Sequence, residues 1–392
     1  MIASQRIEFD VSPAASESES ELVARTVDLF CQRSLGPLCA RAELTMSEAD
    51  LLRLTVQAEQ VGILNVEQEP GLGLWENADD EAGRVASVTT LGKIARVNAG
   101  VAYHWHMLGL GQWLARHLSL CSAQRVIPCL QGSWGMGRAS LARLLLSRPL
   151  VEEDIAILSD YFVATAERPL MFQAGSGWEN LLVPRFSVKH SELSIELWPR
   201  SALELELVPG SHGLDETATH CFWPALQARG VTVSALPAPQ VHELYASALC
   251  LNALGLLAIG AGALQHALGN AVSYAQVRVQ GGIAISAHAA VQELLGNVAS
   301  VEQLVSVALA GLCRRQPCVA QLSAVFGARA QLQPLLCTAA NDALQVFGGL
   351  GYMRDAGVEK LVRDQNCLRV MHGTSSELRR FVAVMSLGPS NG

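Results

Sequence analysis

Apolar residues recur at helical spacing in the first and last thirds of this chain of 392 residues. Between residues 20 and 120, Val23, Val27 and Phe30 fall on one side of a predicted helix, and Ser47 followed by acidic residues is typical of a capped helix start. The same periodicity returns after residue 240. It predicts four long helices, at about 243–278, 287–314, 317–346 and 373–386.

The middle of the chain has short runs that alternate or are rich in β-forming residues, with Gly and Pro between them. These runs predict strands at residues 161–164, 181–183, 193–197 and 203–207. The alternation of Leu and Glu in 203–207 predicts one wet and one dry face. The expected fold is therefore mainly α with a small central β domain. Its parts are an N-terminal helical domain (1–125), a middle β-barrel or β-sandwich domain (126–238) and a C-terminal four-helix bundle (239–392).

One stretch is apolar enough to raise the question of a membrane. Between Leu244 and Val277 there is no charged residue, and Leu249–Leu264 is apolar apart from Asn252 and several glycines. A helix that spans a bilayer needs about 20 apolar residues, and this run is shorter. We expect it to be the central helix of the bundle, covered on all sides, and we expect no membrane partner.

Half of the residues are apolar and 16% are charged. This composition is typical of a chain with much buried surface, so we expect part of the surface to face other subunits of an oligomer. The net charge is −8, opposite in sign to that of most nucleic-acid binders, so no nucleic acid is expected. The ten cysteines are scattered without CxxC pairs. That pattern is typical of buried thiols in a cytoplasmic protein, without a zinc site.

Two histidines, His104 and His106, flank Trp105 in an apolar helical run. Residues two apart on a helix point in different directions, so the two rings do not converge on one metal ion. We expect them to pack in the core.

The C-terminal third holds a series of motifs whose residues suit a nucleotide cofactor. Residues 274–282 read Y-A-Q-V-R-V-Q-G-G, 345–352 read Q-V-F-G-G-L-G-Y, 358–364 read V-E-K-L-V-R-D, and 373–377 read G-T-S-S-E. An arginine offers a planar, always charged fork to a pyrophosphate. Glycines let the backbone approach a cofactor closely, and a hydroxyl at a helix start lies beside free N–H groups.

These motifs, in this order, resemble the acyl-CoA dehydrogenase family, whose members also combine a helical domain, a β domain and a four-helix bundle. The resemblance implies an FAD cofactor, an acyl thioester substrate and a flavoprotein as electron acceptor. It also implies that FAD is shared between neighbouring subunits, in a homodimer or homotetramer. The residues that the resemblance places at FAD are Phe172, Gln173, Arg278, Gln345, Gly348, Gly349, Thr374 and Ser376.

The family's catalytic glutamate is absent from both positions where the resemblance puts it. Most members carry it directly before the G-T pair, and counting from Arg363 puts His372 there; counting back from Glu377 instead puts Gly373 there. A minority carry it on the first bundle helix, where this chain has Asn252. Asparagine cannot take a proton, whereas an imidazole can act as a general base near neutral pH. His372 is therefore the candidate base, and the alternative is that it fills space at a lost active site.

The family's loop beneath the flavin is also not recognisable, because residues 135–140 read G-M-G-R-A-S. Three functions stay open. The first is an FAD-dependent oxidoreductase of an acyl thioester, bound to CoA or to a carrier protein, in a specialised pathway. The second is a silent subunit that lends Arg278, Gln345 and Thr374 to the flavin of an active paralogue. The third is another flavin or thioester reaction on the same fold.

Overall fold

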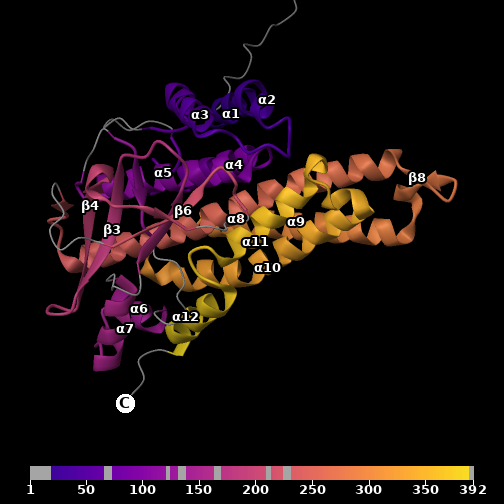
Figure 1. The fold of residues 1–392 in the computed structure, drawn as a ribbon. Coiled ribbons are helices and arrows are strands. Elements are labelled where there is room, and N and C mark those ends of the chain that lie inside the picture. Colours follow the sequence, from indigo (N-terminus) through magenta and orange to yellow (C-terminus); the bar gives the residue numbers. More distant parts are fainter. Residues whose placement is uncertain are drawn as a thin grey trace, which may run out of the picture.

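The computed structural model describes residues 19–65, 73–120, 124–130, 138–162, 169–208, 213–223 and 231–387. It is mainly helical with a small β region, as predicted. Figure 1 shows a long helical bundle, with the N-terminal helices along one side and most strands near one end.

The N-terminal part is helical, with the polar helix starts that the sequence predicts. Ser47 caps a helix by accepting the N–H of Asp50 at 3.1 Å, and Asn98 caps another by accepting the N–H of Val101 at 3.0 Å. Its helices of more than ten residues are α1 (Glu19–Phe30), α3 (Glu48–Gln60), α4 (Glu81–Ala95) and α5 (Ala99–His117).

The β region contains two small sheets. In the first, β1 runs parallel to β3, and the order is β1-β3-β4-β7; in the second, all antiparallel, the order is β2-β6-β5. The strands are β1 (Val126–Pro128), β2 (Leu170–Ala174), β3 (Asn180–Ser187), β4 (Glu192–Pro199), β5 (Glu206–Leu207), β6 (Ala218–Phe222) and β7 (Thr232–Val233).

Two of the predicted strands differ from the structure. Tyr161 and Phe162 end a helix, α7 (Glu152–Phe162), and the other half of the predicted strand lies outside the described residues. Tyr161 and Phe162 are buried together with Leu158 at helical spacing, so the pair was one face of a helix rather than a β run. Of residues 203–207, the structure has a strand only at Glu206–Leu207, and Leu207 is exposed.

The C-terminal bundle contains all four predicted helices and a fifth, shorter one between the last two. That helix covers the V-E-K-L-V-R-D motif, whose charged residues hid its helical period. The bundle helices are α8 (Ala238–Val277), α9 (Ala289–Cys313), α10 (Leu322–Val346), α11 (Val358–Val370) and α12 (Ser375–Leu387).

Helix α8 is the centre of the molecule, as its lack of charge predicts. It contacts α4, α5, α9, α10 and α11. By length and composition, α8 and α9 are the helices of the described residues that could cross a bilayer; the apolar window of α8 is 100% buried, whereas that of α9 is 22% buried. Helix α9 therefore exposes apolar side chains, among them Val307.

The described apolar core is continuous from the N-terminal helices through the β region to the bundle. One close approach between these parts depends on glycine. A Cβ atom added to Gly262 of α8 would lie 2.2 Å from the carbonyl oxygen of Gly92 in α4. The boundaries at residues 125 and 238 stay a prediction.

We expect Gly262→Ala to lower the free energy of unfolding by about 1–3 kcal/mol, because the two helix backbones must separate to admit the methyl group. Gly269→Ala is the matched control on the same helix, since a Cβ atom there meets nothing within 4 Å. It should be neutral or raise stability by up to about 1 kcal/mol through helix propensity. Urea unfolding measures both, and equal effects of the two changes would contradict the close approach.

Candidate functional site

The predicted cofactor residues do not all lie together, and one group of them lies at the end of the bundle where α8 stops. Tyr274 of α8 stacks on Phe347 after α10, with ring centroids 4.5 Å apart and planes at 18°. This contact brings Arg278, directly after α8, and Gln345 in the last turn of α10 to the same end of the bundle. Figure 1 shows the hairpin β8 (Val279–Gln280) to β9 (Ile283–Ala284) at this end.

We call four of these residues the distal group: Arg278, Gln345, Gly348 and Gly349. Each of them is accessible to a ligand. The side chains of Arg278 and Gln345 are exposed. Gly348 has a left-handed φ of 58°, and Cβ atoms added to Gly348 and Gly349 would meet nothing within 4 Å. An exposed guanidinium and open backbone at the same end of the bundle suit an anionic ligand.

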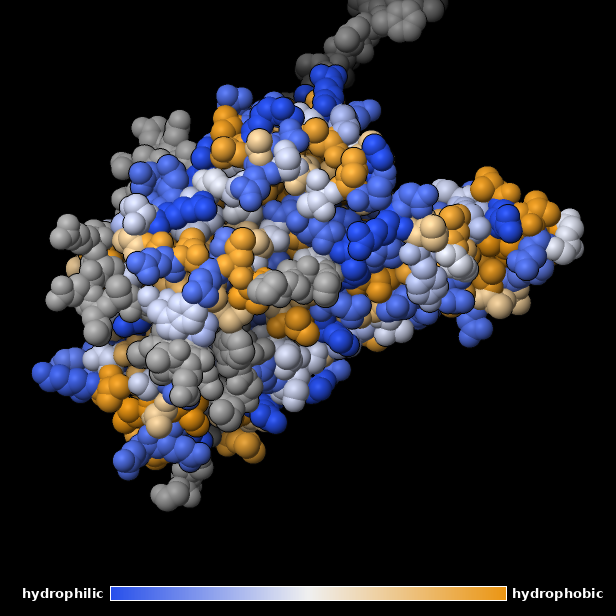
Figure 2. All heavy atoms as spheres, in the orientation of Figure 1, coloured by the Kyte–Doolittle hydropathy of each residue, from blue (hydrophilic) through white to orange (hydrophobic). Residues whose placement is uncertain are grey.

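Exposed apolar side chains surround the distal group. Val277 is 75% exposed and Tyr352 is 68% exposed, and Val279, Leu350 and Met353 are also exposed. Figure 2 shows apolar residues at the tip of the bundle mixed with polar ones. Apolar side chains at this exposure favour contact with another protein surface.

The candidate base, His372, is buried between the bundle and α5. Its Nδ1 lies 2.7 Å from the carbonyl oxygen of Leu130, and its Nε2 lies 3.0 Å from the hydroxyl of Tyr103. A carbonyl accepts and cannot donate, so Nδ1 carries the proton of the neutral ring. Nε2 is then the lone pair, and it accepts the hydroxyl hydrogen of Tyr103.

The backbone at His372 is in the left-handed region, with φ at 49°. A side chain in this conformation costs about 1–3 kcal/mol and is held there by its surroundings. The guanidinium of Arg329 in α10 donates to the carbonyl oxygens of Leu368, Met371 and His372. A buried cation at the C-terminal end of α11 thus fixes the loop that carries the imidazole.

Asn252 stands at the second position where the resemblance predicts the base, and its side chain also has a hydrogen-bond partner within the chain. His106 Nδ1 accepts the indole N–H of Trp75 at 2.8 Å, and His106 Nε2 lies 3.2 Å from Oδ1 of Asn252. Burial lowers the pKa of His106 to about 4, so the ring is neutral at pH 7. His104 has a separate partner, the N–H of Gly175 at 3.1 Å, so the two histidines do diverge.

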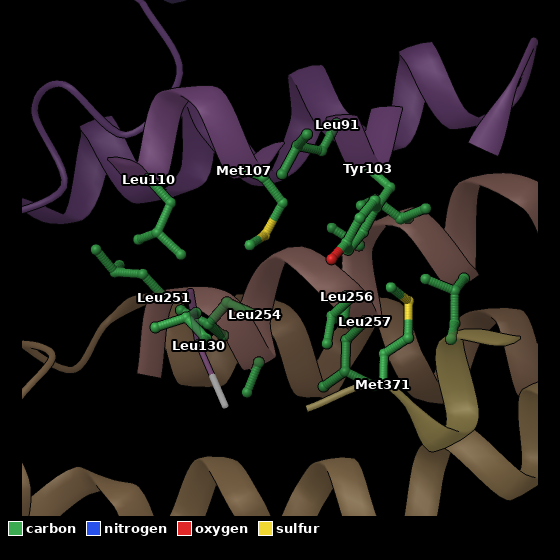
Figure 3. Packing of buried hydrophobic residues seen from close by; sticks show 14 of the residues in the cluster. Leu91, Tyr103, Met107, Leu110, Leu130, Leu251, Leu254, Leu256, Leu257 and Met371 are labelled. Carbon is green, nitrogen blue, oxygen red and sulfur yellow. The ribbon is translucent and has the colours of Figure 1, made fainter. Parts of the chain in front are cut away.

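The space between α5 and α8 beside Tyr103 is filled by apolar side chains. Figure 3 shows Met107 of α5, Leu256 and Leu257 of α8, and Met371 packed around the phenol. All of these side chains are buried. An acyl chain entering between α5 and α8 would therefore have to displace side chains.

Thr374, predicted at the cofactor, caps α12 instead. Its hydroxyl and its N–H each donate to Oε2 of Glu377 at 2.8 Å, and the hydroxyl also accepts the N–H of Glu377 at 3.4 Å. This reciprocal pattern is a capping box. Ser376, in the first turn of α12, is exposed.

Phe172 and Gln173 lie on opposite faces of β2. The ring of Phe172 packs within the β region, stacked on His220 at 5.2 Å and edge-on to Trp178. Gln173 donates to the hydroxyl of Thr217 at 2.6 Å and faces Cys367 of α11. The structure therefore brings Gln173, and not Phe172, to the bundle side. Of residues 135–140, where the family's loop beneath the flavin is not recognisable, 135–137 lie outside the described residues and the rest begin α6 (Arg138–Leu145).

A buried charge cluster joins the β region to α11. Lys360 lies 2.9 Å from Asp364 and 3.3 Å from Glu216, and Arg363 bonds Asp215 at 2.8 Å. Burial lowers the pKa of Lys360, but Asp364 and Glu216 raise it more, so it stays charged. The V-E-K-L-V-R-D motif is thus explained by packing of α11 against the segment around Asp215.

The family model described as Acyl-CoA dehydrogenase, C-terminal domain, matches residues 243–386. The bundle is therefore similar to the C-terminal domain of acyl-CoA dehydrogenases. The same region carries the similarity to a mitochondrial very long-chain specific acyl-CoA dehydrogenase of Macaca fascicularis, 30% identical over 137 residues. That match covers 33% of this chain and only 20% of the relative's length.

Two solved structures are similar over nearly all of the chain. The prolyl acyl carrier protein oxidase AnaB has a TM-score of 0.72 at 13% identity, covering 96% of this chain and 100% of its own. A glutaryl-CoA dehydrogenase of Mycobacterium smegmatis in complex with FADH2 has a TM-score of 0.70 at 13% identity, covering 95% of each chain. The whole chain therefore has the acyl-CoA dehydrogenase fold, and the predicted resemblance is confirmed.

The sequence did not single out Tyr103 or Arg329, and it did not predict the capping role of Glu377. The capping box was readable, because a threonine followed three residues later by a glutamate before an apolar run is its signature. Tyr103 and Arg329 meet His372 across 269 and 43 positions of the chain. No local pattern indicates such contacts.

We expect Thr374→Ala to lower the free energy of unfolding by about 1 kcal/mol, because the first turn of α12 loses its cap. Thr374→Ser keeps a hydroxyl at the cap and should restore most of the loss. Ser376→Ala, at an exposed position two residues on, is the control and should be neutral. Urea unfolding of protein stripped of any ligand is the measurement; unchanged stability in Thr374→Ala would return the hydroxyl to a cofactor role.

Proposed function

We propose that this chain is an FAD-dependent oxidoreductase that acts on an acyl thioester, with the distal group holding the cofactor of a neighbouring subunit. The observation that carries the proposal is the convergence of Arg278, Gln345, Gly348 and Gly349 at one exposed end of the bundle. These residues come from two helices and a turn, and the Tyr274–Phe347 stack aligns them.

FAD supplies the acceptor for a hydride from the thioester. The planar fork of Arg278 suits its pyrophosphate, and the open backbone at Gly348 and Gly349 allows close approach. Thr374 and Phe172 fit the cofactor less well, because Glu377 and the interior of the β region already engage them. Support for FAD thus comes from the distal group and from the similarity to a glutaryl-CoA dehydrogenase described with FADH2.

His372 is the proposed base. Its neutral tautomer carries a lone pair on Nε2, because Nδ1 keeps its hydrogen and donates it to the carbonyl oxygen of Leu130. Arg329 donates to the carbonyl oxygens of Met371 and of His372 itself, which keeps the ring in one place and favours proton transfer to a fixed atom. The imidazole would take the α-proton of the thioester at Nε2.

Association of chains is part of the proposal. The apolar rim of the distal group and the exposed face of α9 would be covered by a second copy, in a homodimer or homotetramer. The substrate carrier is CoA or a carrier protein, and similarity to a prolyl acyl carrier protein oxidase supports considering the latter. A flavoprotein is the proposed electron acceptor, and the cytoplasm the proposed location.

A second function, a silent subunit in a heteromer with an active paralogue, is favoured by one observation. Both positions that carry the base in the family are neutral and satisfied within this chain, His372 by Tyr103 and Asn252 by His106. Such a subunit would still lend the distal group to its partner's flavin. The visible spectrum separates the two: a yellow homo-oligomer bleached by an acyl thioester favours the enzyme, and a chain yellow only with a co-expressed paralogue favours the subunit.

Arg278→Ala should weaken FAD binding about 10- to 100-fold, the loss expected for hydrogen bonds to a charged group. Arg314→Ala is the matched control, because Arg314 is also exposed but follows the opposite end of α9. Flavin retention after gel filtration, read as visible absorbance per subunit, measures the effect. Equal retention in the two variants would reject the distal group as the FAD site.

His372→Asn should abolish bleaching by thioester while FAD stays bound. Asparagine tolerates the left-handed backbone but cannot take a proton, so this change removes the base with little strain. His190→Ala is the control, since His190 is exposed on the β region. Stopped-flow reduction of the flavin is the measurement, and full activity of His372→Asn would refute the assignment of the base.

A further inference from the structure

Tyr103 contacts the one ring nitrogen of His372 that has a lone pair. The Nδ1 side is fixed by the carbonyl of Leu130, so Nε2 is the acceptor and the phenol is its donor, 3.0 Å away. The planes of the two rings are nearly parallel, at 22°, with centroids 6.3 Å apart. The contact between the hydroxyl of Tyr103 and Nε2 is within ordinary hydrogen-bond distance.

The surroundings of Tyr103 keep the hydroxyl neutral and in place. Tyr103 is fully buried, and burial raises its pKa well above the ordinary value. Figure 3 shows its hydroxyl pointing away from α5, toward the side of Leu257 and Met371. A neutral phenol that is held in this way can donate to Nε2 but offers no charge to assist it.

We propose that Tyr103 is a positioning residue for His372: in the resting protein its hydroxyl occupies Nε2, and an acyl thioester must displace it before His372 can take a proton. This inference rests on the proposed role of His372. Proton abstraction then depends on substrate entry, because the phenol lies among the side chains that fill the space between α5 and α8.

The protonation states of His372 are consistent with this order of events. While Tyr103 donates to Nε2, that nitrogen has no second lone pair for a substrate proton. After the phenol moves, Nε2 takes the α-proton and the imidazole becomes a cation, with Nδ1–H still donating to Leu130. The carbonyl oxygen of Leu130 faces the positive ring and stabilises it.

Diethyl pyrocarbonate, which acylates unprotonated imidazole nitrogens, tests the cover on Nε2 in the purified oligomer with whatever cofactor it carries. Peptide mass mapping gives the rate at each histidine. We expect His372 to react far more slowly than exposed His190 in the wild type. Tyr103→Phe should raise the rate at His372 about 2- to 12-fold, the equivalent of a hydrogen bond of about 0.5–1.5 kcal/mol, and Tyr103→Ala should raise it further.

Tyr161→Phe is the matched control, because Tyr161 is another buried tyrosine that ends α7 and stacks edge-on to Phe162. It should leave the rate at His372 unchanged. Wild-type His372 reacting as fast as His190 would overturn the proposal. A rise in Tyr103→Ala alone would also overturn it, because the ring and not the hydroxyl would then be the cover.

The outcome is independent of whether the protein turns over a thioester. If His372 reacts as expected but no thioester bleaches the flavin in the wild type or in Tyr103→Phe, the cover on Nε2 stands and the proposed dehydrogenase function fails. If the wild type bleaches and His372 is nevertheless as reactive as His190, the function stands and the role of Tyr103 fails.

Discussion

The arrangement of the whole chain depends on burying one long helix that carries no charge from Leu244 to Val277. A helix without a polar stripe has no side that water can solvate, so neighbours must cover it all round. Helices α4, α5, α9, α10 and α11 cover its apolar window completely, whereas its last two residues are exposed. Asn252 and Arg278 are 26 residues apart in this sequence, which separates them by roughly 39 Å along the helix. The distal group therefore lies far along α8 from Asn252.

Most of the fold could be predicted because the hydrophobic period of a long segment indicates both its secondary structure and the face that is buried. The unbroken apolar run of α8 predicted a central position, and the cap residue Ser47 predicted a helix start. The errors came from short segments. Tyr161 and Phe162 look like part of a strand when read alone, and they are helical because α7 buries them together with Leu158. In segments this short, tertiary packing decides between the two periods.

The candidate site could be predicted in its residues but not in their partners. Motif spacing led to His372, Arg278 and Thr374, yet what each side chain does depends on its neighbours in space. Thr374 has a local partner, Glu377, and its capping role was legible. His372 has distant ones, Tyr103 and Leu130, and these decide its tautomer and cover its lone pair. The sequence shows which side chains can donate or accept hydrogen bonds, and the fold determines which of them become partners.

The left-handed backbone at His372 also bears on how this chain could change over evolutionary time. A glutamate placed at position 372 would inherit a conformation that glutamate rarely adopts, and a carboxylate in place of the imidazole N–H would face the carbonyl oxygen of Leu130. Negative charge beside a carbonyl oxygen, away from water, is unfavourable. The loop, Tyr103 and Leu130 would have to shift together to accept it, so a carboxylate would be hard to introduce at this position by one substitution alone.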